Sequence, residues 1–161
     1  MNDQSKVMKS QHDVSSNYAL INMTIGDRRF NVAMGKKLEG KANVGTREVK
    51  RLGTNVIGTK AGLVRYSVAL TVYKCTDEFD LALAEYVKTG VMPRVDIQCY
   101  NEDPEVSADI GRSVRNFNDC VMDGDVMQAF ADIEGGSIEQ QINFYAESME
   151  ITEHYRNPDY M

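Results

Sequence analysis

The clearest hydrophobic pattern lies between residues 64 and 101, where three elements are expected in succession. From Val64 to Tyr73, apolar side chains alternate with small or polar ones, and this period of two predicts a half-buried strand. The same period returns after Pro93, over residues 95–100, and predicts a second strand that ends in a turn at 101–104.

One helix is expected between these strands, over about residues 77–89. Thr76 offers a side-chain oxygen to the amides of the first turn, and the acids that follow suit the positive end of the helix dipole. Gly90 supplies a left-handed cap. Four apolar residues share one stripe at helical spacing: Phe79, Leu83, Tyr86 and Val87. The sequence therefore predicts a mainly β fold with one flanking α-helix.

Further strands are expected on both sides of this region. The β-rich runs 18–25 and 29–34 flank Gly26-Asp27 and predict a hairpin, and residues 36–52 indicate a long strand wetted on one side. Gly53, Gly58 and Gly62 punctuate a polar stretch that is typical of a loop and is a candidate for contacts.

The C-terminal part predicts a second hairpin and a further strand. Its two arms are expected at 112–122 and 126–133, around the turn dipeptide Asp123-Gly124. Ile138 to Ala146 continue on a common face, and a change of parity beyond them indicates a bulge near Glu147.

The chain of 161 residues is expected to form a flexible N-terminal arm over 1–17 and a single domain over 18–161. Its apolar runs are too short for a membrane helix, and its first thirty residues lack a signal-peptide pattern, so a cytoplasmic protein is expected. Three cysteines without close pairing, Cys75, Cys99 and Cys120, are interpreted as small buried apolar groups.

Charge is distributed unevenly along the chain. Residues 36–65 hold eight basic and two acidic residues, whereas 96–161 hold fifteen acidic residues and three arginines. Opposite patches of this kind can orient head-to-tail association between copies of one chain, and two ordinarily solvated faces are the alternative. Direct nucleic-acid binding is disfavoured, because the basic stretch has no interleaved aromatic residues and the whole chain carries a net charge of −6.

No motif supports catalysis, a metal site or a cofactor. Residues 35–41 match a phosphate-binding glycine loop as far as Lys41, but Ala42 lacks the hydroxyl that binds magnesium and no helix start follows. Asp123-Gly124-Asp125 lacks the ligand spacing of a calcium loop. The two histidines, His12 and His154, do not combine with other residues into a metal site or a catalytic triad.

Four segments in order resemble the tail tube proteins of contractile-tailed bacteriophages and of phage-tail-like bacteriocins from Gram-positive bacteria. They are Val49-Lys50-Arg51-Leu52-Gly53 with its loop, the strand from Gly62 to Tyr73, the helix end Tyr86-Val87-Lys88-Thr89-Gly90, and residues 95–104. Phe117-Asn118-Asp119-Cys120 resembles the family's aspartate-cysteine strand. The resemblance covers about two thirds of the chain, and the arm before residue 18 does not match.

The resemblance implies a β-sandwich-like or barrel-like tail tube subunit without enzymatic activity or cofactors. Six subunits would form a ring, and stacked rings would form a hollow tube for DNA passage or membrane puncture inside a contractile sheath. The expected partners are further copies, the sheath protein, the tape measure protein, the baseplate and the tail terminator, with DNA only in transit and no stable membrane association. Assembly would take place in the bacterial host cytoplasm, before incorporation into the tail.

Subunit contacts are assigned to four basic residues in or beside the glycine-rich loop: Arg47, Lys50, Arg51 and Lys60. The excess of acid suggests a lumen wall that repels phosphates. Two alternatives remain open: a single-ring homologue from a baseplate or tube initiator, and a monomeric β-barrel that binds a small ligand.

Overall fold

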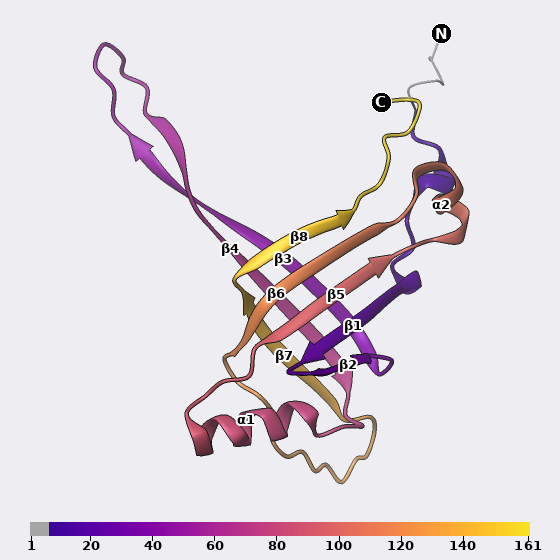
Figure 1. Ribbon diagram of the computed structural model, residues 1–161. Coiled ribbons are helices and arrows are strands. Elements are labelled where there is room, and N and C mark those ends of the chain that lie inside the picture. Colours follow the sequence, from indigo (N-terminus) through magenta and orange to yellow (C-terminus); the bar gives the residue numbers. More distant parts are fainter. Residues whose placement is uncertain (1–6) are drawn as a thin grey trace. The chain divides into compact units, whose positions relative to one another are not determined.

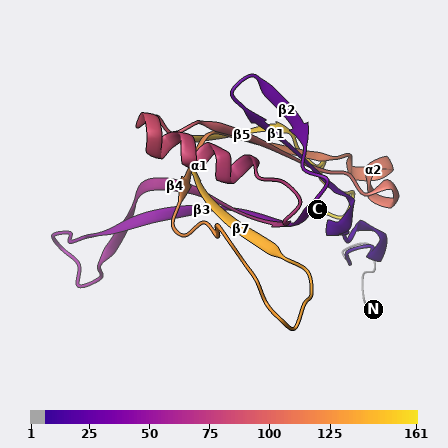
Figure 2. The same cartoon turned by 90° about the horizontal axis from the view of Figure 1, so that it is seen from below.

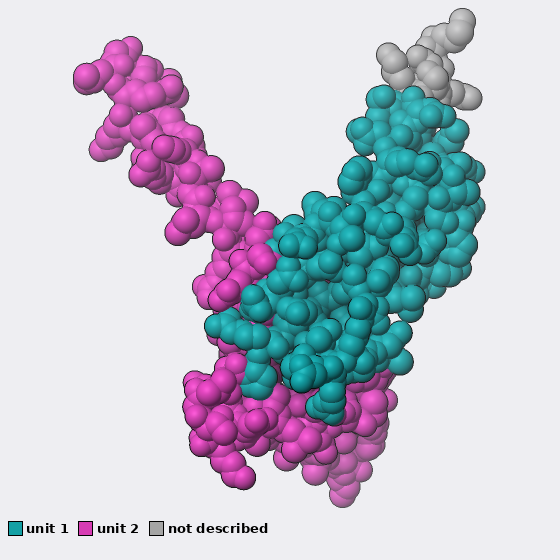
Figure 3. All heavy atoms as spheres, in the orientation of Figure 1, with its two compact units in different colours: residues 1–33, 93–119, 149–161 teal, residues 34–92, 120–148 magenta. Residues whose placement is uncertain are grey.

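The computed structural model describes residues 7–161 (Figure 1). They form two compact units, which are coloured separately in Figure 3. Unit 1 comprises the described residues up to 33 together with 93–119 and 149–161, and unit 2 comprises 34–92 and 120–148. The expectation of one domain over 18–161 stays a prediction.

Unit 1 is built on antiparallel strand pairs. β1 (Ala19–Ile25) pairs with β2 (Arg28–Asn31) and with β5 (Val95–Asn101). β6 (Ser113–Asp123) follows β5 in the sheet, and β8 (Ser148–Glu153) pairs with β6. The predicted N-terminal hairpin is confirmed, and Gly26 takes the positive φ of 60° that its turn requires.

A second helix, α2 (Pro104–Ile110), corrects the expectation of a single helix and a turn at 101–104. The Asp103 side chain caps it by accepting a hydrogen bond of 3.0 Å from the Glu105 amide, and Pro104 occupies the first turn. Val106 and Ile110 are buried. An N-cap aspartate followed by proline and glutamate is a helix-start signal that the turn interpretation of Asn101 to Pro104 overlooked.

The predicted N-terminal arm lies partly outside the described residues, because the structure describes it only from residue 7. Two short 3-10 turns are present, at Ser10–His12 and Ser16–Tyr18, where little local structure was expected. His12 is buried, with Nε2 3.0 Å from Asp109 Oδ2 and Nδ1 3.0 Å from the Tyr160 hydroxyl. The flexibility of the arm stays a prediction.

Unit 2 contains the longest strands of the described chain. β3 (Gly35–Val49) pairs with β4 (Gly58–Tyr73), and β4 pairs with β7 (Glu139–Ala146), which also pairs with the end of β6. The predicted long strand and the strand up to Tyr73 are confirmed. The predicted loop is shorter than expected, because Gly58 and Gly62 belong to β4.

The helix α1 (Glu78–Thr89) is confirmed and covers one face of this sheet. Phe79 packs edge-on against Phe144, with ring centroids 6.5 Å apart, and Gly90 ends the helix at φ 76°. Thr76 Oγ1 accepts a hydrogen bond of 3.3 Å from the Glu78 amide. Of the predicted stripe only Phe79 is buried, since Leu83 is partly exposed and Tyr86 and Val87 are exposed.

A partly buried polar network connects α1 to the sheet. Gln140, only 1% exposed, donates hydrogen bonds of 3.0 Å to Asp80 Oδ1 and to the Met127 carbonyl. Lys74 forms an ion pair with the other Asp80 oxygen and lies 3.2 Å from Asp77. Burial lowers the Lys74 pKa, but its hydrogen bonds to Asp80 and Asp77 outweigh that effect and raise the pKa overall.

The predicted strand at 126–133 is wrong. Residues 124–138 form an irregular loop, and β6 pairs with β7 beyond it. Ile133 in this loop is 100% exposed, so alternation within the run did not reflect a buried face. At Glu147 the strand breaks between β7 and β8 where a bulge was expected.

Two further observations concern membranes and cysteines. No helix in residues 7–161 is long and apolar enough to cross a membrane. Cys120 is buried as expected, whereas Cys99 is partly exposed and Cys75 is exposed, which corrects the interpretation of all three as buried groups. Burial raises the pKa of the Cys99 thiol.

Candidate assembly surface

The pairing of β3 with β4 continues far beyond the strand that supports it. β7 pairs with β4 only from Tyr66 to Tyr73, so residues 44–64 form a two-stranded ribbon on their own (Figures 1 and 2). We call residues 44–64 the hairpin arm.

Two glycines allow the strands of the hairpin arm to approach closely. A side chain on Gly45 would begin 3.2 Å from the Leu63 carbonyl oxygen, and one on Gly62 would begin 3.2 Å from the Gly45 carbonyl oxygen. The register shifts at the same place, between Val44 and Thr46. A Cβ at either position would therefore require the facing strand to move by a few tenths of an ångström.

The structure brings all four predicted contact residues together on the hairpin arm, and all four are exposed. Arg47 and Lys60 are direct cross-strand partners, and Lys50 and Arg51 lie in the turn at the tip. The Arg51 side chain lies against Gly58, where an added Cβ would begin 3.1 Å from Arg51 Nε. Within residues 7–161, none of the four forms an ion pair.

The hairpin arm also exposes apolar side chains, which the sequence interpretation did not single out. Leu63 is 92% exposed, and Leu52 at the tip is fully exposed. Val56 and Ile57 are exposed beside them. Their signal was available in the sequence, because four large apolar residues stand in a stretch otherwise rich in Gly, Thr and Lys. A surface that combines apolar side chains with unpaired basic groups suits a contact with another protein chain.

The outer edge of β3 is a second open surface of unit 2. Among the described residues, β3 pairs only with β4 and ends the strand order. Its backbone amides and carbonyls along this edge can pair with another strand. Most of its side chains are exposed, so an added strand would meet no covering element of this unit.

The chemical motifs rejected from the sequence have no site in the described chain. Residues 35–41 are part of β3 and open no helix, so they cannot form a phosphate-binding loop. In residues 7–161, no three His, Cys, Asp or Glu side chains gather as metal ligands would.

Comparison with known families matches this chain to phage tail tube proteins over residues 6–153, nearly its whole length. The chain belongs to the phage tail tube protein family. It is a structural subunit of a tail tube, which confirms the resemblance drawn from the sequence. Among curated proteins, no sequence matches this tail tube protein.

Solved structures share the fold of the tail tube protein at low sequence identity. A chain from the anti-feeding prophage baseplate, reconstructed with six-fold symmetry, has a TM-score of 0.65 at 12% identity, covering 89% of this chain and 97% of that one. The tube-terminating cap of the same particle gives 0.65 at 15% identity, covering 94% and 99%. A chain from the sheath-tube complex of an extracellular contractile injection system gives 0.61 at 11% identity, covering 89% and 93%.

Proposed function

We propose that six copies of this tail tube protein close into a ring, and that rings stack into a hollow tube inside a contractile sheath. The tube would conduct DNA in a phage or puncture a membrane in a bacteriocin. The open edge of β3 carries this proposal, since fifteen residues of edge strand have no covering element in unit 2. Ring closure would give that edge a strand from the next copy.

Six-fold symmetry is supported by the structures that share the fold. The anti-feeding prophage baseplate is described as six-fold symmetrised, and the tail of an empty gene transfer agent particle was computed with C6 symmetry. The latter has a TM-score of 0.54 to this chain. A common fold favours the same ring size here.

The hairpin arm is the proposed contact between subunits. Arg47 and Lys60 face each other across the ribbon, and two like charges in direct cross-strand positions destabilise an isolated hairpin. An acidic surface on a neighbouring copy would relieve that repulsion, and residues 96–161 hold fifteen acids. Apolar side chains at the tip, Leu52 among them, would be buried in the same contact.

We propose further partners from the position of a tube subunit inside a contractile tail. The sheath protein would surround the tube, the tape measure protein and DNA would occupy its lumen, and the baseplate and tail terminator would close its ends. Sheath, tube and terminator occur together in the names of structures that share the fold. We propose assembly in the bacterial host cytoplasm, no enzymatic activity and no stable membrane association.

A single-ring component is the second candidate function. The baseplate and cap chains give a TM-score of 0.65 and the sheath-tube chain gives 0.61, so the fold is shared with chains from a baseplate, a tube-terminating cap and a sheath-tube complex. Electron microscopy of the purified protein separates the candidates. We expect long hollow filaments, whereas isolated rings would favour the second candidate and featureless monomers would contradict both.

The double substitution Lys50→Glu and Arg51→Glu tests the hairpin arm. We expect a folded subunit that forms no tubes, because both residues lie in the exposed tip, where substitutions usually change the free energy of unfolding by less than about 0.5 kcal/mol. Circular dichroism and electron microscopy are the measurements.

The matched control exchanges the two residues, as Lys50→Arg with Arg51→Lys, and keeps the charge at the tip. We expect this variant to form tubes. Normal tubes from the charge-reversed variant would show that the tip makes no required contact between subunits.

A further inference from the structure

The irregular loop at residues 124–138 combines exposed apolar side chains with a single sign of charge. Ile133 is fully exposed and Phe130 is 52% exposed. The loop has no basic residue and carries a formal charge of −3 from three exposed acids, Asp125, Asp132 and Glu134. We call residues 124–138 the acidic loop.

The charges of the acidic loop are not neutralised within the described chain. In residues 7–161, none of its three carboxylates forms an ion pair. Other acids of the C-terminal part are engaged, since Asp103 caps α2 and Glu153 pairs with Arg112. The carboxylates of the acidic loop therefore remain available to a cation from another molecule.

The hairpin arm is the chemical complement of the acidic loop. It contains four basic residues and Glu48, which gives a formal charge of +3 against −3 for the loop. Both surfaces also expose large apolar side chains, with Leu52 in the arm and Ile133 in the loop fully exposed. Contact between two arms or between two loops would bring like charges together, whereas an arm and a loop bring opposite charges together. The charges therefore favour a heterologous contact, in which each copy contributes a different surface.

The two surfaces adjoin opposite ends of β4. The acidic loop lies at the Tyr73 end, where the Lys74 amide donates a hydrogen bond of 2.8 Å to the Ile138 carbonyl. The hairpin arm continues from the other end, beyond Tyr66, the last residue of β4 that pairs with β7. Figure 1 shows the arm and the acidic loop at opposite ends of this sheet.

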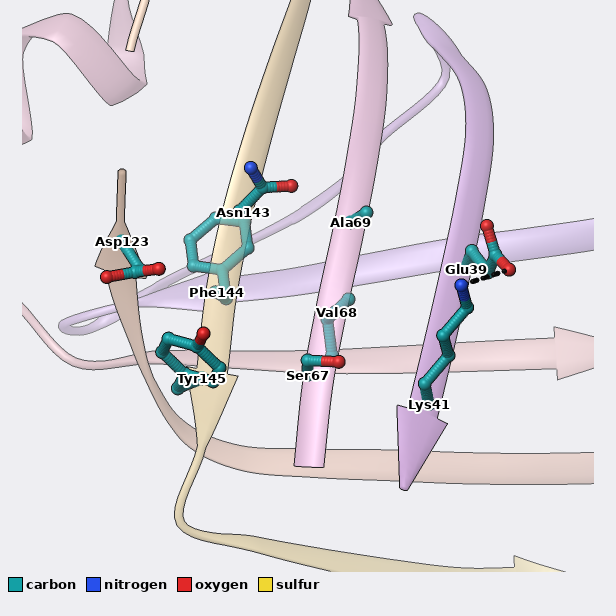
Figure 4. A pocket seen from close by; sticks show the side chains of 9 residues that line it. All are labelled: Glu39, Lys41, Ser67, Val68, Ala69, Asp123, Asn143, Phe144 and Tyr145. Atoms are coloured by element: carbon teal, nitrogen blue, oxygen red, sulfur yellow. Dashed lines mark ion pairs between the residues drawn. The ribbon is translucent and has the colours of Figure 1, made fainter. Parts of the chain in front are cut away.

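Three paired strands separate the arm from the acidic loop. At Ala69, β4 pairs with Glu39 of β3 on one side and with Asn143 of β7 on the other, and Figure 4 shows these strands side by side. Beyond Tyr66, β4 continues into the arm for eight residues, about 26 Å at about 3.3 Å per residue. The arm therefore extends away from the acidic loop of its own chain, and only another copy can bring the two together.

We propose that the acidic loop is the docking site for the hairpin arm of a second copy. This inference rests on the proposed function and deepens it, because it names the surface that receives the arm. The basic groups of the arm would lie against the three carboxylates of the loop. Leu52 at the tip of the arm would cover Phe130 and Ile133, which removes exposed apolar surface from water on both copies.

The positions of the two surfaces give the assembly a direction. Each copy offers an arm at one end of β4 and an acidic loop at the other, so the contact repeats from copy to copy and does not close on a pair. Strands of a closed barrel are tilted by about 35–45° from its axis, so a contact between strand ends leads out of the plane of a ring. The contact would therefore join successive rings, with free arms at one end of a tube and free loops at the other.

Reciprocal charge reversal tests the contact. The arm variant, Lys50→Glu with Arg51→Glu, changes the charge of the arm from +3 to −1, and the loop variant, Asp125→Lys with Glu134→Lys, changes that of the loop from −3 to +1. Asp132 is kept, because its Oδ1 accepts a hydrogen bond of 3.0 Å from the Glu134 amide. Each variant has an arm and a loop of like charge, so we expect about tenfold less pelleted tube protein than from the wild type.

A chain with all four substitutions has an acidic arm and a basic loop, so opposite charges meet again. We expect it to form tubes in an amount within about twofold of the wild type. An equal mixture of the arm variant and the loop variant should also form tubes, because the arm of each suits the loop of the other. Circular dichroism checks that each variant is folded. The matched control is Asp27→Lys with Glu85→Lys, which changes the net charge equally at two exposed positions outside the acidic loop and should assemble.

Cross-linking tests the position of the contact without changing its charges. Exposed Cys75 is replaced by Ser, and Asn55→Cys in the arm is combined with Ala131→Cys in the acidic loop, both at exposed positions. A short bismaleimide can join these positions only between copies. In assembled tubes, we expect a ladder of covalent dimers, trimers and longer chains on a denaturing gel, whereas either cysteine alone should give dimers at most.

The outcomes separate the docking site from the proposed function. Tubes from the arm variant or the loop variant alone, or no tubes from both the mixture and the chain with four substitutions, would overturn the docking site and leave the tail tube function standing. Loss of tubes from the control variant would attribute the effects to net charge, and tubes without a cross-linked ladder would place the arm elsewhere; either result also overturns the docking site. Wild-type protein that forms no tubes would contradict the proposed function and the docking site together.

Discussion

The hairpin arm and the β4-β7 part of unit 2 are made from the same strand but differ in what supports them. From Tyr66 to Tyr73, β4 lies between two strands and under α1, and Val68, Leu70 and Val72 are buried. From Gly58 to Val64 the same strand has one neighbour, and its apolar side chains are exposed. One continuous strand thus serves as core at one end and as free surface at the other.

This difference separates folding from assembly. The β4-β7 part has its own core and is expected to fold in the isolated subunit. The hairpin arm buries almost nothing, and a two-stranded ribbon alone is marginally stable in water. Its order is therefore expected to increase when a neighbouring copy covers it, so substitutions in the two regions should affect different measurements.

The largest effect is expected from Phe144→Ala. Comparing it with Leu63→Ala tests whether folding of the subunit and assembly of the tube depend on different regions. Phe144 is 1% exposed and packs on Phe79, so its truncation should lower the free energy of unfolding by about 3–5 kcal/mol. Leu63→Ala should change it by less than about 0.5 kcal/mol, yet prevent tube formation. Urea denaturation and electron microscopy are the measurements.

The opposite result is equally informative. A large loss of subunit stability from Leu63→Ala would mean that the hairpin arm packs within the isolated subunit. Normal tubes from this variant would exclude its side chain from the contact between copies.

The same separation explains how much of the fold the sequence predicts. Where a face is buried, as from Val68 to Val72 and from Ile142 to Ala146, the period of two identified the strands correctly. The run 126–133 has similar residues but no neighbouring strand, so local pattern predicted a strand that pairing does not support. The helix α2 has only seven residues, too few to show a clear helical period in the sequence. Its sequence signal is the N-cap residue Asp103 followed by Pro104.

The candidate assembly surface was also predictable from the sequence only in part. Arg47, Lys50, Arg51 and Lys60 could be placed on one segment from their charge and the nearby glycines. Their common exposure on a ribbon could not be predicted, because it depends on where β7 stops pairing with β4.

Arg47→Glu is expected to change the stability of the subunit and the assembly of the tube in opposite directions, each by an intermediate amount. A glutamate opposite Lys60 replaces a like-charge pair by an opposite-charge pair, which should stabilise the isolated subunit by roughly 0.2–1 kcal/mol. The same change removes a cation proposed to meet acids of a neighbouring copy, so tube formation should weaken. Thermal unfolding and sedimentation of assembled material measure the two effects. A variant that gains stability and still assembles normally would remove Arg47 from the contact.

The smallest effect is expected for residues 7–17 of unit 1. Like the hairpin arm, this segment is not covered by a sheet, but side-chain hydrogen bonds to Asp103 and Asp109 hold it in place. Asp103 accepts a hydrogen bond of 3.0 Å from the Ser15 amide, and Asp109 accepts one of 3.0 Å from Gln11 Nε2 and lies 3.0 Å from His12. The Ser15 amide lowers the pKa of Asp103, and His12 lowers that of Asp109.

A carboxylate whose pKa is lowered by folding stabilises the folded state above its unfolded pKa of about 3.9, and that contribution disappears as the pH falls through the lower folded value. Acidification below about pH 4 should therefore release residues 7–17 before the core of unit 1 unfolds. Hydrogen exchange of the Ser15 amide, followed from pH 6 downward, measures this release. Asp103→Asn with Asp109→Asn should give the same fast exchange at neutral pH, because both carboxylates are then absent. Unchanged protection in the double variant would show that the turns at Ser10–His12 and Ser16–Tyr18 hold this segment without the two carboxylates.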